Sequence, residues 1–285
     1  MQEKDSVLLQ KIKDVLKIHP YYGYPRISMQ LWINKNKTYR IMQNNWLSAK
    51  QRKKRKFIKT NDIWFTKMKI ENIKKKIKKY DKENNTKMYD WFINTPNTVI
   101  ATDFTHLYWK WHEFYLATVI DNYTKEIVWC DIWFNHDQDF IIWTTKNAIN
   151  KTFKLFWFLP NYLHSDQWSE YRWFKHLKLL EKNWIKPSMS KKASPWENWL
   201  QEWFYWKLKL ELWDLNRFSS MEEAISEVYS YIYYYNNLRM HTSIKMTPVE
   251  FRKIEQEKIN NNKNYLKNKN KKLEKIEKIL EKKIK

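Results

Sequence analysis

Glycine is almost absent from this chain of 285 residues, whose single glycine is Gly23. Average usage of about 7% would give roughly 20 glycines. Because glycine is the usual residue where the backbone needs a positive φ, other residues must build the turns and helix ends here. Tryptophan, with 18 residues, stands at several such places. The segment KNWIKP at 182–187, for example, ends a predicted helix just before a predicted strand.

Cysteine and long apolar segments are also scarce. The one cysteine, Cys130, excludes an intramolecular disulfide framework and a zinc site built on a CxxC pair. No apolar run approaches the ~20 residues that a membrane span needs. The N-terminal segment MQEKDSVLLQKIKD lacks the apolar stretch of a signal peptide. We therefore expect a cytoplasmic protein with no membrane partner.

Acidic residues are outnumbered, with 31 Asp and Glu against 54 Lys and Arg and a formal net charge of +23. This surplus favours a polynucleotide partner and a nucleoid-associated location. A dense basic run, KQRKKRK at 50–56, would neutralise phosphates without reading base sequence. Its candidate DNA-binding residues are Arg52, Lys53, Lys54, Arg55 and Lys56.

Three carboxylates stand out among the few acidic residues. Asp103, Asp166 and Glu202 occur in ATDFTH, LHSDQW and ENWLQEWFYWKLK, with 35 residues between the last two. Carboxylate oxygens are hard ligands that suit Mg²⁺ or Mn²⁺, and two such ions can clamp a phosphodiester during in-line displacement. The alternatives are that Asp166 only caps the next helix and that Glu202 is a solvated helix residue.

The central part of the chain alternates between strand and helix patterns. Strands are predicted at Val99–Tyr108, Phe114–Asp121, Glu126–Phe134, Tyr162–Ser165 and Lys186–Ser190, and helices at Phe140–Lys151, Ser169–Lys182, Glu197–Leu212 and Glu222–Asn236. This order predicts an α/β core in which the strand before Asp166 lies beside the strand that carries Asp103.

The N-terminal part has a helical pattern. Leu8, Ile12, Val15 and Leu16 recur at helical spacing, and Pro20 ends that helix. The following segment, RISMQLWINKNKTYRIMQNNW, predicts two short helices and thus a helix-turn-helix. Its candidates for major-groove contact are Lys35, Lys37 and Arg40. The alternative is a small helical bundle with a solvated basic face.

Several further segments, in order, resemble one known family. They are PYYGYPRIS at 20–28, TVIATDFTHLY at 98–108, FYLATVIDNYTKEIV at 114–128, LHSDQWSEY at 163–171, KPSMSKKASPWENWLQEWFYWKLKLEL at 186–212 and YYYNNLRMHTSIKMTPVEF at 233–251. With the 35-residue spacing, the chain resembles the OrfB-type transposases of the IS-three family of insertion sequences, from roughly Leu8 to Arg252. These share the catalytic core of retroviral integrases.

The resemblance implies an RNase H-like core with a five-stranded mixed sheet flanked by helices, after an all-α helix-turn-helix domain. It implies a DDE transposase in which Asp103, Asp166 and Glu202 hold two Mg²⁺ or Mn²⁺ ions for DNA cleavage and strand transfer. The implied partners are the terminal inverted repeats, target DNA, further copies of the chain on DNA, and a helix-turn-helix protein from an upstream frame. The alternatives are an inactive transposon-derived DNA-binding protein and an RNase H-like nuclease.

Residues near the carboxylates are further candidates. His164 and Asn198 are placed to orient the metal ligands, although His164 also fits a packed strand position. Lys191 and Lys192, before the Glu202 helix, are placed to bind a DNA end or to lie in a solvated loop. The resemblance implies that Arg239 supports DNA near the site.

The expected organisation is a helix-turn-helix domain at 1–58, a basic linker at 59–95, the integrase core at 96–258 and a basic helical tail at 259–285. In the resembled family several tryptophan positions are usually small, most often glycine: Trp168, Trp184, Trp199, Trp206 and Trp213. We hypothesise that many of these tryptophans come from UGA codons that the source organism reads as glycine. The alternative is a protein that is rich in tryptophan.

Overall fold

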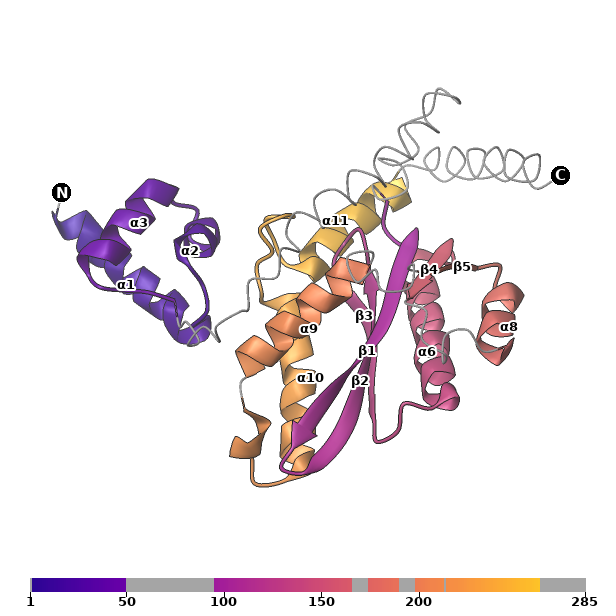
Figure 1. The fold of residues 1–285 in the computed structure, drawn as a ribbon. Helices are drawn as coiled ribbons and strands as arrows, with labels where there is room; N and C mark the ends of the chain where they lie inside the picture. Colours follow the sequence, from indigo (N-terminus) through magenta and orange to yellow (C-terminus); the bar gives the residue numbers. More distant parts are fainter. Residues whose placement is uncertain (1, 50–94, 166–173, 190–197, 213, 262–285) are drawn as a thin grey trace, which may run out of the picture.

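The computed structural model describes residues 2–49, 95–165, 174–189, 198–212 and 214–261. Figure 1 shows a small group of helices from the N-terminal part and a sheet with helices on both faces. In the part of the chain so described, no helix combines the length and apolar character needed to cross a membrane.

The sheet has five strands in the order β3-β2-β1-β4-β5. The first three form an antiparallel meander, whereas β4 runs parallel to β1 and β5 runs parallel to β4. This is the RNase H-like mixed sheet, so the predicted fold class is confirmed. The strands are β1 (Val99–Trp109), β2 (His112–Asp121), β3 (Ile127–Trp133), β4 (Tyr162–Ser165) and β5 (Lys186–Met189).

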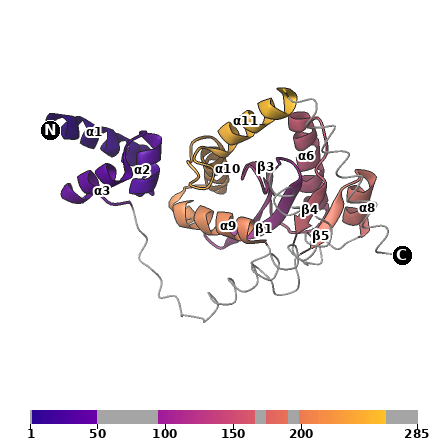
Figure 2. The same ribbon diagram turned by 90° about the horizontal axis from the view of Figure 1, so that it is seen from above.

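Two pairs of helices cover the two faces of the sheet (Figures 1 and 2). Side chains of a strand alternate between the faces. Accordingly, Leu107 of β1 packs with Phe204 and Leu208 of α9, whereas Ile100 packs with Ile149 of α6 and Leu180 of α8. The helices are α6 (Gln138–Phe156) and α8 (Phe174–Lys182) on one face, and α9 (Trp199–Leu212) and α10 (Met221–Asn237) on the other.

The N-terminal helices have an apolar core of their own. They are α1 (Gln2–Ile18), α2 (Tyr24–Gln30) and α3 (Lys35–Asn44). Leu8, Ile12 and Val15 of α1 are buried against Ile27 and Ile41, as their helical spacing predicts. Helix α1 ends before Pro20, and the side chain of Asn34 accepts hydrogen bonds from the first turn of α3. The predicted all-α N-terminal module is therefore present.

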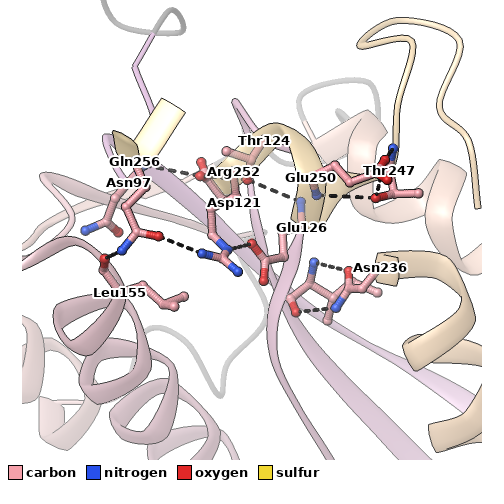
Figure 3. A network of polar contacts seen from close by, with 11 residues as sticks. Asn97, Asp121, Thr124, Glu126, Leu155, Asn236, Thr247, Glu250, Arg252 and Gln256 are labelled. Carbon is pink, nitrogen blue, oxygen red and sulfur yellow. Dashed lines mark hydrogen bonds and ion pairs between the residues drawn. The ribbon is translucent and has the colours of Figure 1, made fainter. Parts of the chain in front are cut away.

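Helix α11 (Pro248–Asn261) lies where no helix is predicted. The side chains of Thr247 and Glu250 cap its first turn, and Arg252 forms an ion pair at 2.6 Å with Glu126, just before β3 (Figure 3). Gln256 donates a hydrogen bond to the carbonyl of Leu155 in α6. Because α11 continues to residue 261, it crosses the predicted boundary at residue 258. The boundary at residue 58 falls outside the described residues, so the division into domains stays a prediction.

Other element ends shift by a few residues. β2 begins two residues before the predicted start, and α6 runs on to Phe156, five residues past the predicted end. The starts predicted at Ser169 and Glu197 and the tail beyond residue 261 lie outside the described residues.

Candidate active site

Asp103 lies near the middle of β1, on the sheet face that α9 covers. It shares the parity of Leu107, which packs against α9, and it pairs across the sheet with Thr118 of β2. Its carboxylate Oδ1 accepts a hydrogen bond of 2.8 Å from the backbone N–H of Phe104. A half-buried carboxylate on a central strand is thus presented to α9, as the apolar strand pattern around it predicts.

Helix α9 is fixed across β1 and β2 by two side chains one turn apart. The amide of Gln201, which is fully buried, donates to the carbonyls of Ala101 at 2.6 Å and Thr118 at 3.2 Å, and accepts from the Thr118 hydroxyl at 2.8 Å. The hydroxyl of Tyr205 donates to the carbonyl of Asp103 at 2.5 Å. These bonds tie the beginning of α9 to the strand position that carries Asp103.

Glu202 follows Gln201 in the first turn of α9 and is exposed. Gln201 holds this turn against β1 through the carbonyl of Ala101, two residues before Asp103. The helix N-terminus also favours a negative charge at this position. The alternative that Glu202 is a solvated surface residue agrees with its exposure. It does not explain why Gln201 fixes this turn to the sheet.

Lys209 is a cation of this site that the sequence analysis missed. It lies seven residues after Glu202, which is two helical turns and therefore the same side of α9. Burial lowers the pKa of Lys209, and the nearby Asp103 carboxylate raises it. The seven-residue spacing from Glu202 could have identified Lys209 from the sequence. In the same way, the i,i+4 spacing of Gln201 and Tyr205 could have identified these two residues as one side of the helix.

Asp166 lies outside the described residues, so the third carboxylate of the predicted triad keeps the status of a prediction. The described part of β4 ends one residue earlier, at Ser165. β4 runs parallel to β1 with Ala101 opposite His164. Within the described ranges, which leave out Asp166, no three His, Cys, Asp or Glu side chains gather closely enough to hold a metal ion.

The two residues predicted to orient the carboxylates have different surroundings. His164 is half-buried, and its Nδ1 lies 2.9 Å from the hydroxyl of Ser188 on β5. Asn198 is buried directly before α9, and its Oδ1 has no hydrogen-bond partner among the described residues. His164 thus contacts the neighbouring strand, and its role toward the carboxylates stays a prediction.

Arg239 does not have the position predicted for a DNA contact. Its side chain is fully buried, and its guanidinium holds both oxygens of Glu211 on α9 at 2.7 and 3.1 Å. Tyr231 donates a further hydrogen bond of 3.0 Å to Glu211. The prediction for Arg239 is therefore wrong, because a guanidinium with no exposed surface cannot reach a phosphate.

The three basic residues of α3 that are predicted to contact DNA each have a partner within the N-terminal helices. Lys37 and Arg40 both pair with the carboxylate of Asp5 on α1, at 3.0 and 2.9 Å. The ammonium of Lys35 lies over the ring of Tyr24. The other predicted DNA contacts, at residues 52–56 and 191–192, lie outside the described residues.

The chain matches two models described as integrase core domain, at residues 94–195 and 202–255, which together span more than half of it. InsK of insertion sequence element IS150 in Escherichia coli strain K12 is 32% identical over 167 residues, 57% of each chain. The transposase for insertion sequence element IS904 of Lactococcus lactis is 31% identical over 161 residues, 55% of this chain and 62% of the relative. The aligned part thus spans about three fifths of these two relatives.

Solved structures of retroviral proteins are also similar. One is a chain of the simian T-cell lymphotropic virus intasome, with a TM-score of 0.49, 18% identity and coverage of 56% of this chain and 55% of that one. Another is the HTLV-2 integrase catalytic core domain in complex with magnesium, with a TM-score of 0.41, 16% identity and coverage of 55% and 97%. The sheet order and the two core-domain matches agree: the chain belongs to the family of proteins with an integrase core domain, and the sequence relatives it resembles are transposases of insertion sequences.

Proposed function

We propose that the chain is a DNA transposase that cleaves the ends of an insertion sequence and joins them to target DNA. The observation that supports the proposal is that Gln201 and Tyr205 fix the first turns of α9, the helix that carries Glu202, to β1, the strand that carries Asp103. The membership of the integrase-core family and the formal charge of +23 support DNA as the substrate. The specific assignment to the OrfB type of the IS-three family is part of this proposal.

The donor set fits a divalent metal. Carboxylate oxygens are the preferred ligands of Mg²⁺ and Mn²⁺. The electrostatic interaction of Lys209 with Asp103 supports the fit further, because it indicates that the Asp103 carboxylate lies where a positive charge is stabilised. Asp103, Asp166 and Glu202 are the proposed ligands of two ions. Bound there, the ions would lower the pKa of a water and stabilise charge on the attacking and leaving oxygens.

The residues of the chain supply position and charge for two successive reactions. In the first, water attacks the phosphodiester at the element end, the bond to the 3′ oxygen breaks, and a 3′-OH is released. In the second, that 3′-OH attacks a phosphodiester of the target and displaces another 3′ oxygen. Both steps are direct displacements, so no protein nucleophile is needed. Gln201 and Tyr205 hold the ligands in place, and Lys209 offsets phosphate charge beside them.

The proposed partners are the terminal inverted repeats, the target DNA and further copies of the chain on the DNA. A helix-turn-helix protein from an upstream frame is a further proposed partner. Its presence would be seen in the flanking DNA as an overlapping frame beside inverted repeats.

Changing the carboxylates tests the proposal. Asp103→Asn and Glu202→Gln should each lower the rate of metal-dependent cleavage on the order of a thousandfold, because each removes a metal ligand. This corresponds to a loss of about 4 kcal/mol of transition-state stabilisation. Affinity for the DNA end should change little. The measurement is cleavage of a labelled element end in Mg²⁺, beside a binding assay in Ca²⁺.

A matched control is Glu222→Gln, which changes an exposed glutamate in the first turn of α10 instead of α9. It should retain full cleavage. Full activity in Glu202→Gln would remove Glu202 from the site. A chain that binds DNA ends but cuts none in any divalent metal would instead support the inactive DNA-binding alternative.

A further inference from the structure

The N-terminal helices contact the catalytic core through the turn between α1 and α2. Tyr22, which is 1% exposed, places its hydroxyl against the segment that follows α10. This hydroxyl donates to the carbonyl of Leu238 at 3.4 Å and accepts from the backbone N–H of Met240 at 2.6 Å. One side chain thus serves two backbone groups of a loop more than 200 residues away in sequence.

His19 completes the contact. Its ring stacks on Tyr22, with centroids 4.4 Å apart and planes within 9°, and its Nδ1 lies 3.1 Å from the hydroxyl of Tyr234 on α10. Burial and the nearby guanidinium of Arg239 lower the pKa of His19. The side chain of Met240 packs against the apolar core of the N-terminal helices. The contact therefore combines polar and apolar parts.

The loop that receives Tyr22 is itself anchored to α9. Arg239, between the two residues that Tyr22 bonds, forms the buried pair with Glu211 near the end of α9. Glu202 lies in the first turn of the same helix, nine residues earlier, which is about 14 Å along the axis at ~1.5 Å per residue. A rigid helix therefore connects the docked N-terminal module to the proposed catalytic carboxylate.

We propose that His19 and Tyr22 are positioning residues that dock the N-terminal helices on the loop after α10 and thereby set the DNA bound by those helices at a fixed place relative to Glu202. The inference rests on the proposed function for its consequence, which is cleavage at a defined bond. The docking itself follows from the contacts of Tyr22, His19 and Met240 and needs no DNA. If the N-terminal helices bind DNA as predicted, this docking gives a structural reason for the position of the cut.

Tyr22→Phe tests the docking in the whole protein, because it keeps the ring that stacks on His19 and removes only the hydroxyl. Hydrogen exchange at the Met240 amide should become roughly tenfold faster, the effect of losing one hydrogen bond of ordinary strength. Amides of α1 and α3 should exchange as before, which would show that the module stays folded. The control is Tyr21→Phe, which removes the same group one residue earlier, at a half-buried position.

A cleavage assay tests the consequence. With an element end as substrate, Tyr22→Phe should bind DNA with unchanged Kd, cleave at the correct bond several-fold more slowly at saturation, and cut more often at neighbouring bonds. Unchanged exchange at Met240 would overturn the docking, and this result does not depend on whether the protein cuts DNA. Faster exchange with unaltered cleavage rate and position would overturn the positioning role while leaving the proposed function intact.

Discussion

At the residue scale, four tryptophans among the described residues adopt the left-handed backbone conformation. Trp32, Trp46, Trp157 and Trp184 have φ of 54°, 53°, 62° and 57°, and their exposed fractions are 94, 95, 74 and 91%. Trp157 directly follows α6, and the other three each stand two residues after the end of a helix, namely α2, α3 and α8. After α2, α3 and α8, the residue that follows the tryptophan donates its backbone N–H to the carbonyl five residues earlier, as Leu47 does to Met42. This is the Schellman motif, in which the position of the tryptophan is usually occupied by glycine.

This geometry supports the glycine hypothesis at Trp184, which the sequence singles out, and extends it to three positions that the sequence does not. Trp199 and Trp206 behave differently, because both lie within α9 with helical backbone. Because these two residues do not adopt the left-handed conformation, the backbone gives no reason to expect glycine there. Trp168 and Trp213 lie outside the described residues.

Replacing these tryptophans by glycine gives a stability prediction. Trp184→Gly should raise the free energy of unfolding by about 1 kcal/mol, because a side chain in the left-handed region costs about 1–2 kcal/mol and an exposed indole contributes little burial. Trp206→Gly, a control in a helix interior, should lower it by about 1 kcal/mol. Urea denaturation of both variants measures the two signs.

If Trp184→Gly destabilises the protein as much as Trp206→Gly does, the left-handed argument fails. Mass spectrometry of the protein from its native host tests the origin separately. Peptides that contain glycine at positions 32, 46, 157 and 184 would support reading of UGA as glycine. Tryptophan in those peptides would contradict it.

At the element scale, α11 is attached to the core through buried charge. Glu126 and Arg252 pair with side chains about one tenth exposed. Burial raises the pKa of Glu126 to about 7, with Arg252 lowering it and Asp121 raising it. A carboxyl group that is costly to ionise thus lies where α11 meets the end of the β2–β3 hairpin (Figure 3).

This pKa has a definite consequence for stability. The unfolded chain releases the Glu126 proton near its ordinary pKa of about 4.5, whereas the folded chain keeps it up to about 7. The folded state binds more protons in this window, so Glu126 makes the free energy of unfolding fall as pH rises from about 4.5 to 7. Above pH 7 its contribution is constant.

Glu126→Gln should therefore reduce the loss of stability between pH 5 and pH 8, since the amide stays neutral throughout. The measurement is thermal unfolding of both proteins across that range. Glu257→Gln, an exposed change on the same helix as Arg252, is the control and should leave the slope as it is. A slope in Glu126→Gln equal to that of the unaltered protein would show that Glu126 does not titrate in this window.

At the scale of the whole molecule, the charge of +23 predicts binding that depends strongly on salt. Replacing Lys53, Lys54, Arg55 and Lys56 by glutamine should weaken binding to all DNA sequences alike. The slope of log affinity against log salt should flatten by about 0.9 for each phosphate that the variant no longer neutralises. Titration of two unrelated duplexes over a series of salt concentrations measures both effects.

The matched control neutralises Lys146 and Lys154, two exposed lysines of α6 on the sheet face opposite α9. Their replacement should leave the slope nearly unchanged. An equal change per replaced charge in both sets would mean that net charge alone governs binding. Weaker binding to one duplex only would point to base readout by the basic run.

Local patterns in the sequence determined much of this protein. The helical spacing of Leu8, Ile12 and Val15 and the stop at Pro20 define α1, and the apolar run around Asp103 defines β1. Such patterns are interpreted correctly because backbone geometry fixes the period of each element independently of its neighbours. The ordered motifs, together with the spacing of Asp166 and Glu202, indicated the family as well, whereas the geometry of the complete triad remains a prediction.

Only the tertiary structure decided which side chains meet across long distances in sequence. It placed Arg239 in a buried pair with Glu211, docked Tyr22 on the Leu238–Met240 backbone, and attached α11 through Arg252. The sequence around a charged residue or a residue with a hydroxyl group looks the same whether its side chain faces water, DNA or another side chain. Its role depends on the partners that packing brings to it and on the water that packing removes.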